Sequence, residues 1–193
     1  MDSSTARRHH PGPPETRTRW RTVWPAALGV VVAAGTAYGV TDGREVAPVV
    51  AASGVVYLAA AATGRRQIGW AAFGVTFVVI GLDTAVGLDA TPWLLAFAAA
   101  LLGIGLIGRR VRPLWALPLQ TAAMLALATA ALIATHLDAT AGGVVVGAAL
   151  LGHAAWDVHH HRTGRVVNRS LAEFCAVLDV IFAVVIGYIA LTG

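Results

Sequence analysis

Residues 65–112 read RRQIGWAAFGVTFVVIGLDTAVGLDATPWLLAFAAALLGIGLIGRRVR, and this stretch decides the fold class. It contains two apolar segments, 68–88 and 91–108, with Asp89 between them and arginines at both outer ends. A helix needs about 20 residues to cross the hydrocarbon of a bilayer, within a range of about 17 to 25. Both segments meet this requirement, so the stretch predicts a pair of antiparallel transmembrane helices.

The rest of the chain repeats this pattern. Five more apolar stretches lie at 22–40, 48–64, 114–137, 142–161 and 172–192. In lipid the backbone polar groups must be satisfied within the segment, and the alternation of a membrane β-barrel is missing. We therefore predict an all-α bundle of seven transmembrane helices over residues 20–193. Residues 1–19 have little apolar surface to bury and are predicted to be a disordered basic tail.

Composition supports a membrane protein and excludes several other classes. The chain is 57% hydrophobic and only 12% charged, whereas a soluble domain carries about 25% charged residues. A soluble fold and a nucleic-acid-binding domain are therefore excluded, and the lipid bilayer is the expected partner. The 14 basic residues are all arginine, so no lysine can form a Schiff base with retinal. The single cysteine, Cys175, precludes an intramolecular disulfide.

The arginines predict the orientation of the bundle. Of the 14 arginines, 13 precede the first apolar stretch or fall in every second loop after it. Arg44 is the one exception. Loops rich in arginine face the cytoplasm in the positive-inside bias. With seven spans, this places the N-terminus in the cytoplasm and the C-terminus outside.

Ionisable residues inside the last two apolar stretches predict a site. At 100° per residue, His153, Asp157 and His160 share one helix face, with His161 at its edge. Asp179 lies in the next stretch, and the 1.5 Å rise puts it about 12 Å deep, close to the depth of about 13 Å for His153. Ionisable groups at such depth are candidates for function. We expect these side chains to face each other around a polar cavity open to the cytoplasm, which Gln120 from the 114–137 stretch could join.

Imidazole and carboxylate groups together suit zinc, iron or manganese. The candidate metal ligands are His153, Asp157, His160, His161 and Asp179, with Cys175 as an optional ligand. Asp157 and Asp179 are the candidate catalytic residues, either at a metal or in metal-free acid chemistry. Two alternatives remain open: a His153–Asp179 pair that only fixes the helix register, and a run at His159–Arg162 that is only a basic flank. Glu173 could pair with Arg169, cap a helix or take part in catalysis.

The last two apolar stretches carry a motif, H-x-x-W-D-x-x-H-H, at His153, Trp156, Asp157, His160 and His161. It is followed by C-x-x-x-D at Cys175 and Asp179. The combination resembles a family of small bacterial integral-membrane proteins to which no activity is assigned. The resemblance covers only the chain from His153 onward. It implies a multi-pass protein of the bacterial cytoplasmic membrane. It also favours His160 and His161 as residues of the site.

Three functions are compatible with these residues. The first is an enzyme that acts on a lipid-soluble small molecule by metal or acid–base chemistry, and acid catalysis of the terpene-cyclase kind is one variant. The second is an ion- or proton-coupled transporter that uses the same groups as a relay. The third is an accessory membrane subunit with a buried polar contact. The sequence leaves the oligomeric state open.

Two local features carry structural predictions. Pro118 lies inside the 114–137 stretch and is expected to kink that helix. Gly35 with Gly39, and Gly143 with Gly147, form G-x-x-x-G patterns. We expect both patterns to serve close helix packing within one chain rather than dimerisation.

Overall fold

The computed structural model describes residues 15–193, with side chains from Val23 onward, as helices and short connections without a strand. The helices are α1 (Glu15–Ala37), α2 (Ala47–Thr63), α3 (Ile68–Val86), α4 (Ala90–Ile107), α5 (Leu117–His136), α6 (Ala139–Thr163) and α7 (Arg169–Thr192), with a short 3₁₀-helix at Gly43–Val46. This confirms the all-α class for the described residues. Positions 1–14 of the predicted tail lie outside them.

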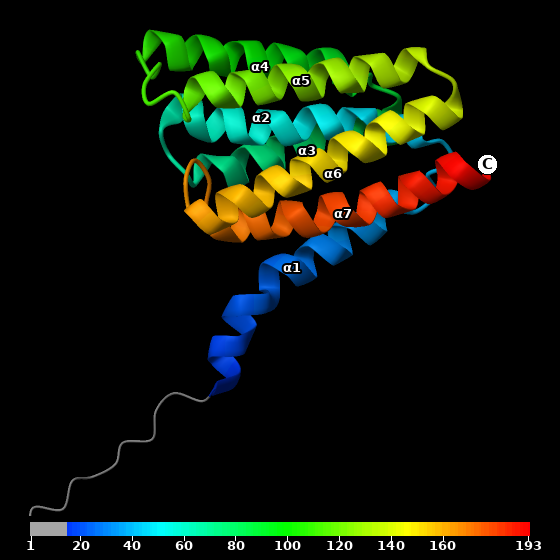
Figure 1. Cartoon of the computed structure of the whole chain (residues 1–193), viewed down its shortest axis with the longest axis horizontal. Coiled ribbons are helices and arrows are strands. Elements are labelled where there is room, and N and C mark those ends of the chain that lie inside the picture. The colour runs from blue at the N-terminus through cyan, green and yellow to red at the C-terminus, as the bar shows by residue number, and fades with distance from the viewer. Residues whose placement is uncertain (1–14) are drawn as a thin grey trace, which may run out of the picture.

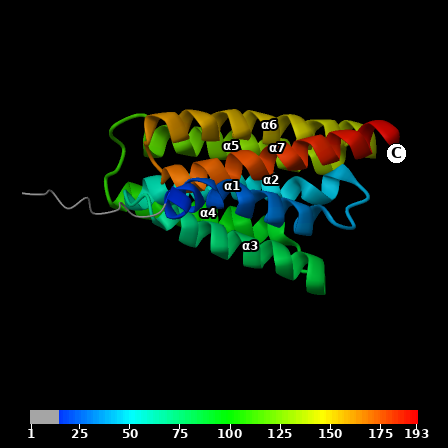
Figure 2. The ribbon, with the colours of Figure 1, turned by 90° about the horizontal axis from the view of Figure 1, so that it is seen from below.

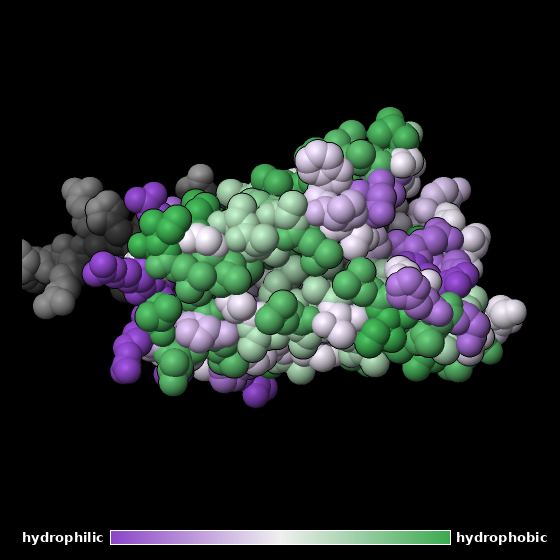
Figure 3. Space-filling model, turned by 90° about the horizontal axis from the view of Figure 1, so that it is seen from above, coloured by the Kyte–Doolittle hydropathy of each residue, from purple (hydrophilic) through white to green (hydrophobic). Residues whose placement is uncertain are grey.

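Six helical segments are long and apolar enough to cross a membrane: Gly43–Thr63, Ile68–Val86, Ala90–Ile107, Leu117–His136, Ala139–Thr163 and Arg169–Thr192. The apolar part of α1, Val23–Ala37, is shorter. Many large apolar side chains on these helices are exposed, among them Val78, Ile104, Leu125 and Val184. Figure 3 shows this apolar surface between two more polar ends. Such a surface is compatible with a multi-pass membrane protein.

The predicted start of the first helix was wrong. Helix α1 begins at Glu15, so residues 15–19 are helical rather than part of a disordered tail. Arginine has a high helix propensity, and a helix that has formed in an apolar segment extends readily into such residues. Pro25 lies inside α1 and cannot donate a backbone hydrogen bond. The N-terminal part of α1 leaves the bundle at an angle (Figure 1).

Helix α2 is the most buried helix and contacts α3, α4, α5 and α6. Its sequence, APVVAASGVVYLAAAAT, consists mostly of small residues, so neighbouring helices can approach it closely on several sides. Helices α6 and α7 pack along each other, and α1 packs on α7 (Figures 1 and 2). Polar side chains on α6 and α7 that face α2 are therefore withdrawn from lipid and solvent.

Pro118 does not kink α5, which corrects the prediction. The helix begins at Leu117, so Pro118 occupies its first turn, where a backbone N–H has no partner within the helix. The preceding residues 113–116 form a turn rather than another helical turn. The proline thus starts the helix instead of bending it.

The two glycine patterns behave differently. A Cβ atom at Gly143 would lie 2.8 Å from the Cβ of Ala190, and one at Gly147 would lie 3.5 Å from the Ala183 carbonyl. This pattern brings α6 close to α7, which confirms packing within one chain. Gly35 and Gly39 have no atom within 4 Å of such a position, so this pair does not serve helix packing in this chain.

Candidate functional site

His153 and Asp157 on α6 meet Asp179 on α7 in the interior of the bundle. The Nδ1 atom of His153 lies 2.7 Å from Oδ2 of Asp179 and 3.4 Å from Oδ2 of Asp157. The exposed fractions of His153, Asp157 and Asp179 are 3%, 0% and 1%. The i,i+4 spacing places both α6 residues on the face toward α7, as the sequence predicted. These three residues form what we call the His/Asp group.

Tyr57 of α2 completes this group, and the sequence analysis missed it. Its hydroxyl donates a hydrogen bond of 2.5 Å to Oδ1 of Asp157, and its ring meets the ring of His153 edge-on. A signal was present, because tyrosines of membrane helices favour the interfaces and Tyr57 stands near the centre of an apolar stretch. A central tyrosine needs a partner for its hydroxyl.

The His/Asp group is short of hydrogen bonds and of positive charge. His153 Nε2, Asp157 Oδ2 and Asp179 Oδ1 are buried and have no hydrogen-bond partner. Two ionised carboxylates with a single imidazole leave net negative charge, even when the imidazole is protonated. An uncompensated buried charge is very costly. The group therefore requires either an additional proton on a carboxylate or a bound cation.

The same three residues could hold a metal ion, since one ligand atom from each lies within 4.8 Å of the others. Zinc binds nitrogen and oxygen at about 2.0–2.2 Å, so two tetrahedral ligand atoms lie about 3.4 Å apart. The 3.4 Å between His153 Nδ1 and Asp157 Oδ2 equals this spacing, but an Nδ1 that donates its hydrogen to Asp179 cannot bind a metal at the same time. The 2.7 Å between His153 Nδ1 and Asp179 Oδ2 is instead the length of a hydrogen bond. Of the two Asp179 oxygens, the unpaired Oδ1 is the one left for a cation.

His160 is buried on the predicted face but does not join the group. Its Nδ1 lies 2.9 Å from the Trp156 carbonyl, and its Nε2 lies 3.3 Å from the amide nitrogen of Gln120. The amide oxygen of Gln120 accepts a hydrogen bond from Trp156 Nε1, so its nitrogen must donate toward His160. Nδ1 of His160 then carries the proton and Nε2 accepts. Both nitrogens are occupied, so His160, which the sequence predicted as a metal ligand, lies outside the His/Asp group in this structure.

Gln120 therefore contacts His160 and Trp156 rather than His153 or Asp179, the residues that the sequence analysis suggested. His161 also lies away from the group, because its helical position turns it outward. Its side chain is 44% exposed, and its Nε2 lies 4.0 Å from Glu173 Oε2. The predicted ligand His161 is therefore outside the His/Asp group, and it lies beside Glu173, for which Arg169 was one of the partners considered.

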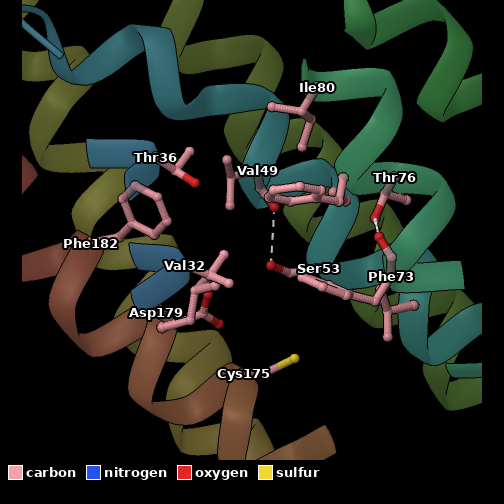
Figure 4. Close-up of a pocket in the computed structure, with 14 residues that line it drawn as sticks. Val32, Thr36, Val49, Ser53, Phe73, Thr76, Ile80, Cys175, Asp179 and Phe182 are labelled. Atoms are coloured by element: carbon pink, nitrogen blue, oxygen red, sulfur yellow. Dashed lines mark hydrogen bonds between the residues drawn. The ribbon is translucent and has the colours of Figure 1, made fainter. Parts of the chain in front are cut away.

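An apolar cavity of about 50 Å³ reaches Asp179 between α1, α2, α3 and α7. Figure 4 shows Asp179 and Cys175 on one wall, with Ser53 of α2 and aromatic side chains around them. Val32, Phe73, Ile80 and Phe182 supply much of the apolar lining. Phe77 also lines the cavity and is partly exposed, so the cavity approaches the surface at the side of the bundle. The sequence analysis had expected a cavity open at the arginine-rich end.

Comparison with known proteins identifies no related protein. No family model, curated protein or solved structure matches this chain. The resemblance to bacterial membrane proteins stays a prediction.

Proposed function

We propose that this chain is a seven-span protein of a bacterial cytoplasmic membrane and an enzyme for a lipid-soluble small molecule. The observation that carries the proposal is the position of Asp179, which belongs both to the buried His/Asp group and to the wall of the apolar cavity. A reactive carboxyl group is thus placed where an apolar ligand can contact it. Small-molecule sites combine an apolar lining with a few polar groups, and this cavity of about 50 Å³ must widen to admit a ligand of more than a few atoms.

The arginine distribution supports the proposed topology. The α2–α3, α4–α5 and α6–α7 loops carry arginines and lie together at one end of the bundle (Figure 1). The opposite loops carry Asp42, Asp89 and Asp138. The positive-inside bias then assigns the arginine end to the cytoplasm. Helix α1 serves as the first span, although its apolar part is short.

Acid–base chemistry is the reaction type that the contacts support best. His153 bonds Asp179 through Nδ1, and Tyr57 holds Asp157 in place. We assign Asp179 as the acid that gives its proton to the ligand in the cavity. The hydrogen bond from His153 Nδ1 then stabilises the Asp179 carboxylate, and Asp157 Oδ2 lies 3.4 Å from the same nitrogen. The ligand carries the positive charge until it loses a proton, which returns to Asp179. The low polarity of the site strengthens these interactions.

The test is a screen that needs no assumed substrate. Lipid extract from the host cells is incubated in D₂O with the purified full chain, and products are examined by mass spectrometry. We expect a lipid-soluble compound to gain deuterium or change mass with the wild type and with Asp83→Asn. The Asp179→Asn variant should lose this change. A reaction that persists in Asp179→Asn contradicts the assignment.

A divalent metal is the second candidate, and the three unpaired polar atoms of the group favour it. His153, Asp157 and Asp179 would hold zinc, iron or manganese, which would supply Lewis-acid chemistry. Metal analysis of the untagged chain in mild detergent tests this. About one equivalent of metal that is lost in His153→Gln and Asp157→Asn but kept in His136→Gln would support it. Negligible metal in all four proteins would contradict the metal site and favour metal-free acid chemistry at Asp179.

A further inference from the structure

The arginine-rich end of the bundle contains a hollow of about 260 Å³ that is separate from the His/Asp group. Three loops enclose it. Arg66 comes from the α2–α3 loop, Arg110 and Arg112 come from the α4–α5 loop, and Val166 comes from the α6–α7 loop. Trp115 and the last turns of α2 supply apolar lining. Three arginine residues thus line one space that also has an apolar wall.

These arginines have no acidic partner among the side chains that the structure describes. The three loops, at 64–67, 108–116 and 164–168, contain no aspartate or glutamate. Among the described residues, the one arginine that forms a salt bridge is Arg44, at the opposite end of the bundle. Arg165 stacks over the ring of Trp115 at 5.3 Å, which adds a fourth positive charge beside the hollow. Within residues 23–193, whose side chains the structure describes, no carboxylate neutralises the positive charge around the hollow.

The position of Arg110 is defined by packing. Gly64 ends α2 in the left-handed region with a φ of 65°, and a Cβ atom there would lie 2.8 Å from Cζ of Arg110. The missing side chain of Gly64 thus leaves room for the Arg110 guanidinium beside the end of α2. The positive-inside bias accounts for arginines at this end, but it does not require three of them to line one hollow.

We propose that this hollow binds a phosphate group, either of an anionic lipid or of a free phosphate compound. The planar guanidinium group forms paired hydrogen bonds with phosphate oxygens, and several of them together neutralise the charge. Basic pockets between membrane helices suit lipid headgroups, and the apolar wall of this one can contact the carbon chain that follows a phosphate. The proposal is independent of the His/Asp group.

The experiment measures binding to the full chain purified in a neutral detergent. The probes are dihexanoyl phosphatidic acid, dihexanoylglycerol and inorganic phosphate, titrated by isothermal calorimetry. The variants are Arg110→Gln, Arg110→Lys and Arg162→Gln. Arg162 is exposed at the same end but does not line the hollow, so the last variant removes the same charge elsewhere. Thermal unfolding without ligand checks that each variant is folded.

We expect phosphatidic acid to bind and dihexanoylglycerol not to bind. Arg110→Gln should weaken binding at least tenfold, Arg110→Lys should weaken it less, and Arg162→Gln should change it less than twofold. Inorganic phosphate that binds as tightly as phosphatidic acid assigns the site to free phosphate, and much weaker binding assigns it to a lipid. Equal losses in Arg110→Gln and Arg162→Gln, or no binding by the wild type, overturn the proposal.

Discussion

At the scale of single residues, the site depends on which hydrogen-bonding atoms of each side chain are already occupied. His153 and His160 are both buried on the same face of α6. Only His153 keeps an unpaired ring nitrogen, because Gln120 and the Trp156 carbonyl occupy both nitrogens of His160. Helical spacing could identify both residues, but it could not separate a reactive imidazole from a structural one.

Tyr57→Phe removes the hydroxyl that donates to Asp157 and leaves a buried carboxylate oxygen without its partner. Hydrogen bonds to charged groups contribute about 1.5–3 kcal/mol, so we expect the free energy of unfolding to fall by about 2 kcal/mol. Unfolding in mixed detergent micelles measures the change. Tyr188→Phe is the control, since Tyr188 is exposed and should have no effect. Equal stability of both variants would show that the Tyr57 bond contributes little.

Asp179→Asn should separate stability from function. The substitution replaces the proton-donating carboxyl group of the proposed acid with a neutral amide of the same shape, whose oxygen can still accept a hydrogen bond from His153. Because neither side chain is charged, we expect the free energy of unfolding to change by less than about 1 kcal/mol. Thermal unfolding of the metal-free protein measures this. A large loss of stability would indicate that the ionised carboxylate is itself needed for folding.

At the scale of elements, helix contacts depend on small residues at particular positions. Gly143→Ala would place a methyl group 2.8 Å from Ala190, which is too close for two carbon atoms. We expect a loss of about 1–3 kcal/mol, because α6 and α7 must move apart. Gly152→Ala on the same helix is the control. No atom lies within 4 Å of its Cβ position, so this change should be neutral or stabilise by up to about 1 kcal/mol. Chemical denaturation compares the two, and the reverse order would contradict this account of packing.

The connection between α1 and α2 should be sensitive to acid. Asp42 caps the 3₁₀-helix and pairs with Arg44, and the side-chain hydrogen bond from Arg44 lowers the pKa of Asp42 below its usual value. The carboxylate therefore stabilises the folded state above about pH 4, and this contribution is lost as the pH falls through the lowered value. Arg44 also donates to the Leu137 carbonyl, so the effect reaches the end of α5.

Thermal unfolding between pH 7 and pH 3 tests this. The wild type should lose stability at the acid end, and Asp42→Asn should lose less over the same range because it has no carboxylate to protonate. Identical pH profiles for the two proteins would show that this pair makes no measurable contribution.

At the scale of the whole molecule, the proposed topology can be tested with single cysteines placed at the two opposite ends of the bundle. In a Cys175→Ser background, single cysteines replace Val111 in the α4–α5 loop and Ala139 after the α5–α6 loop. A thiol reagent that does not cross membranes should label Ala139→Cys in intact cells. Val111→Cys should react only after the cells are lysed. Labelling in the opposite order would invert the bundle, and labelling of both in intact cells would contradict the paired spans.

The sequence by itself determined the helical class and the approximate extent of most helices, and it predicted that His153, Asp157 and Asp179 face each other, which the structure shows. Hydrophobic length and helical periodicity are local properties, and short loops force α6 and α7 to lie side by side. Only the tertiary structure decided the roles of Tyr57, His160 and His161, since these depend on which helix covers each face. The cavity at Asp179 and the hollow around Arg110 are also tertiary features. Each is formed by elements far apart in the sequence, whose packing no local pattern records.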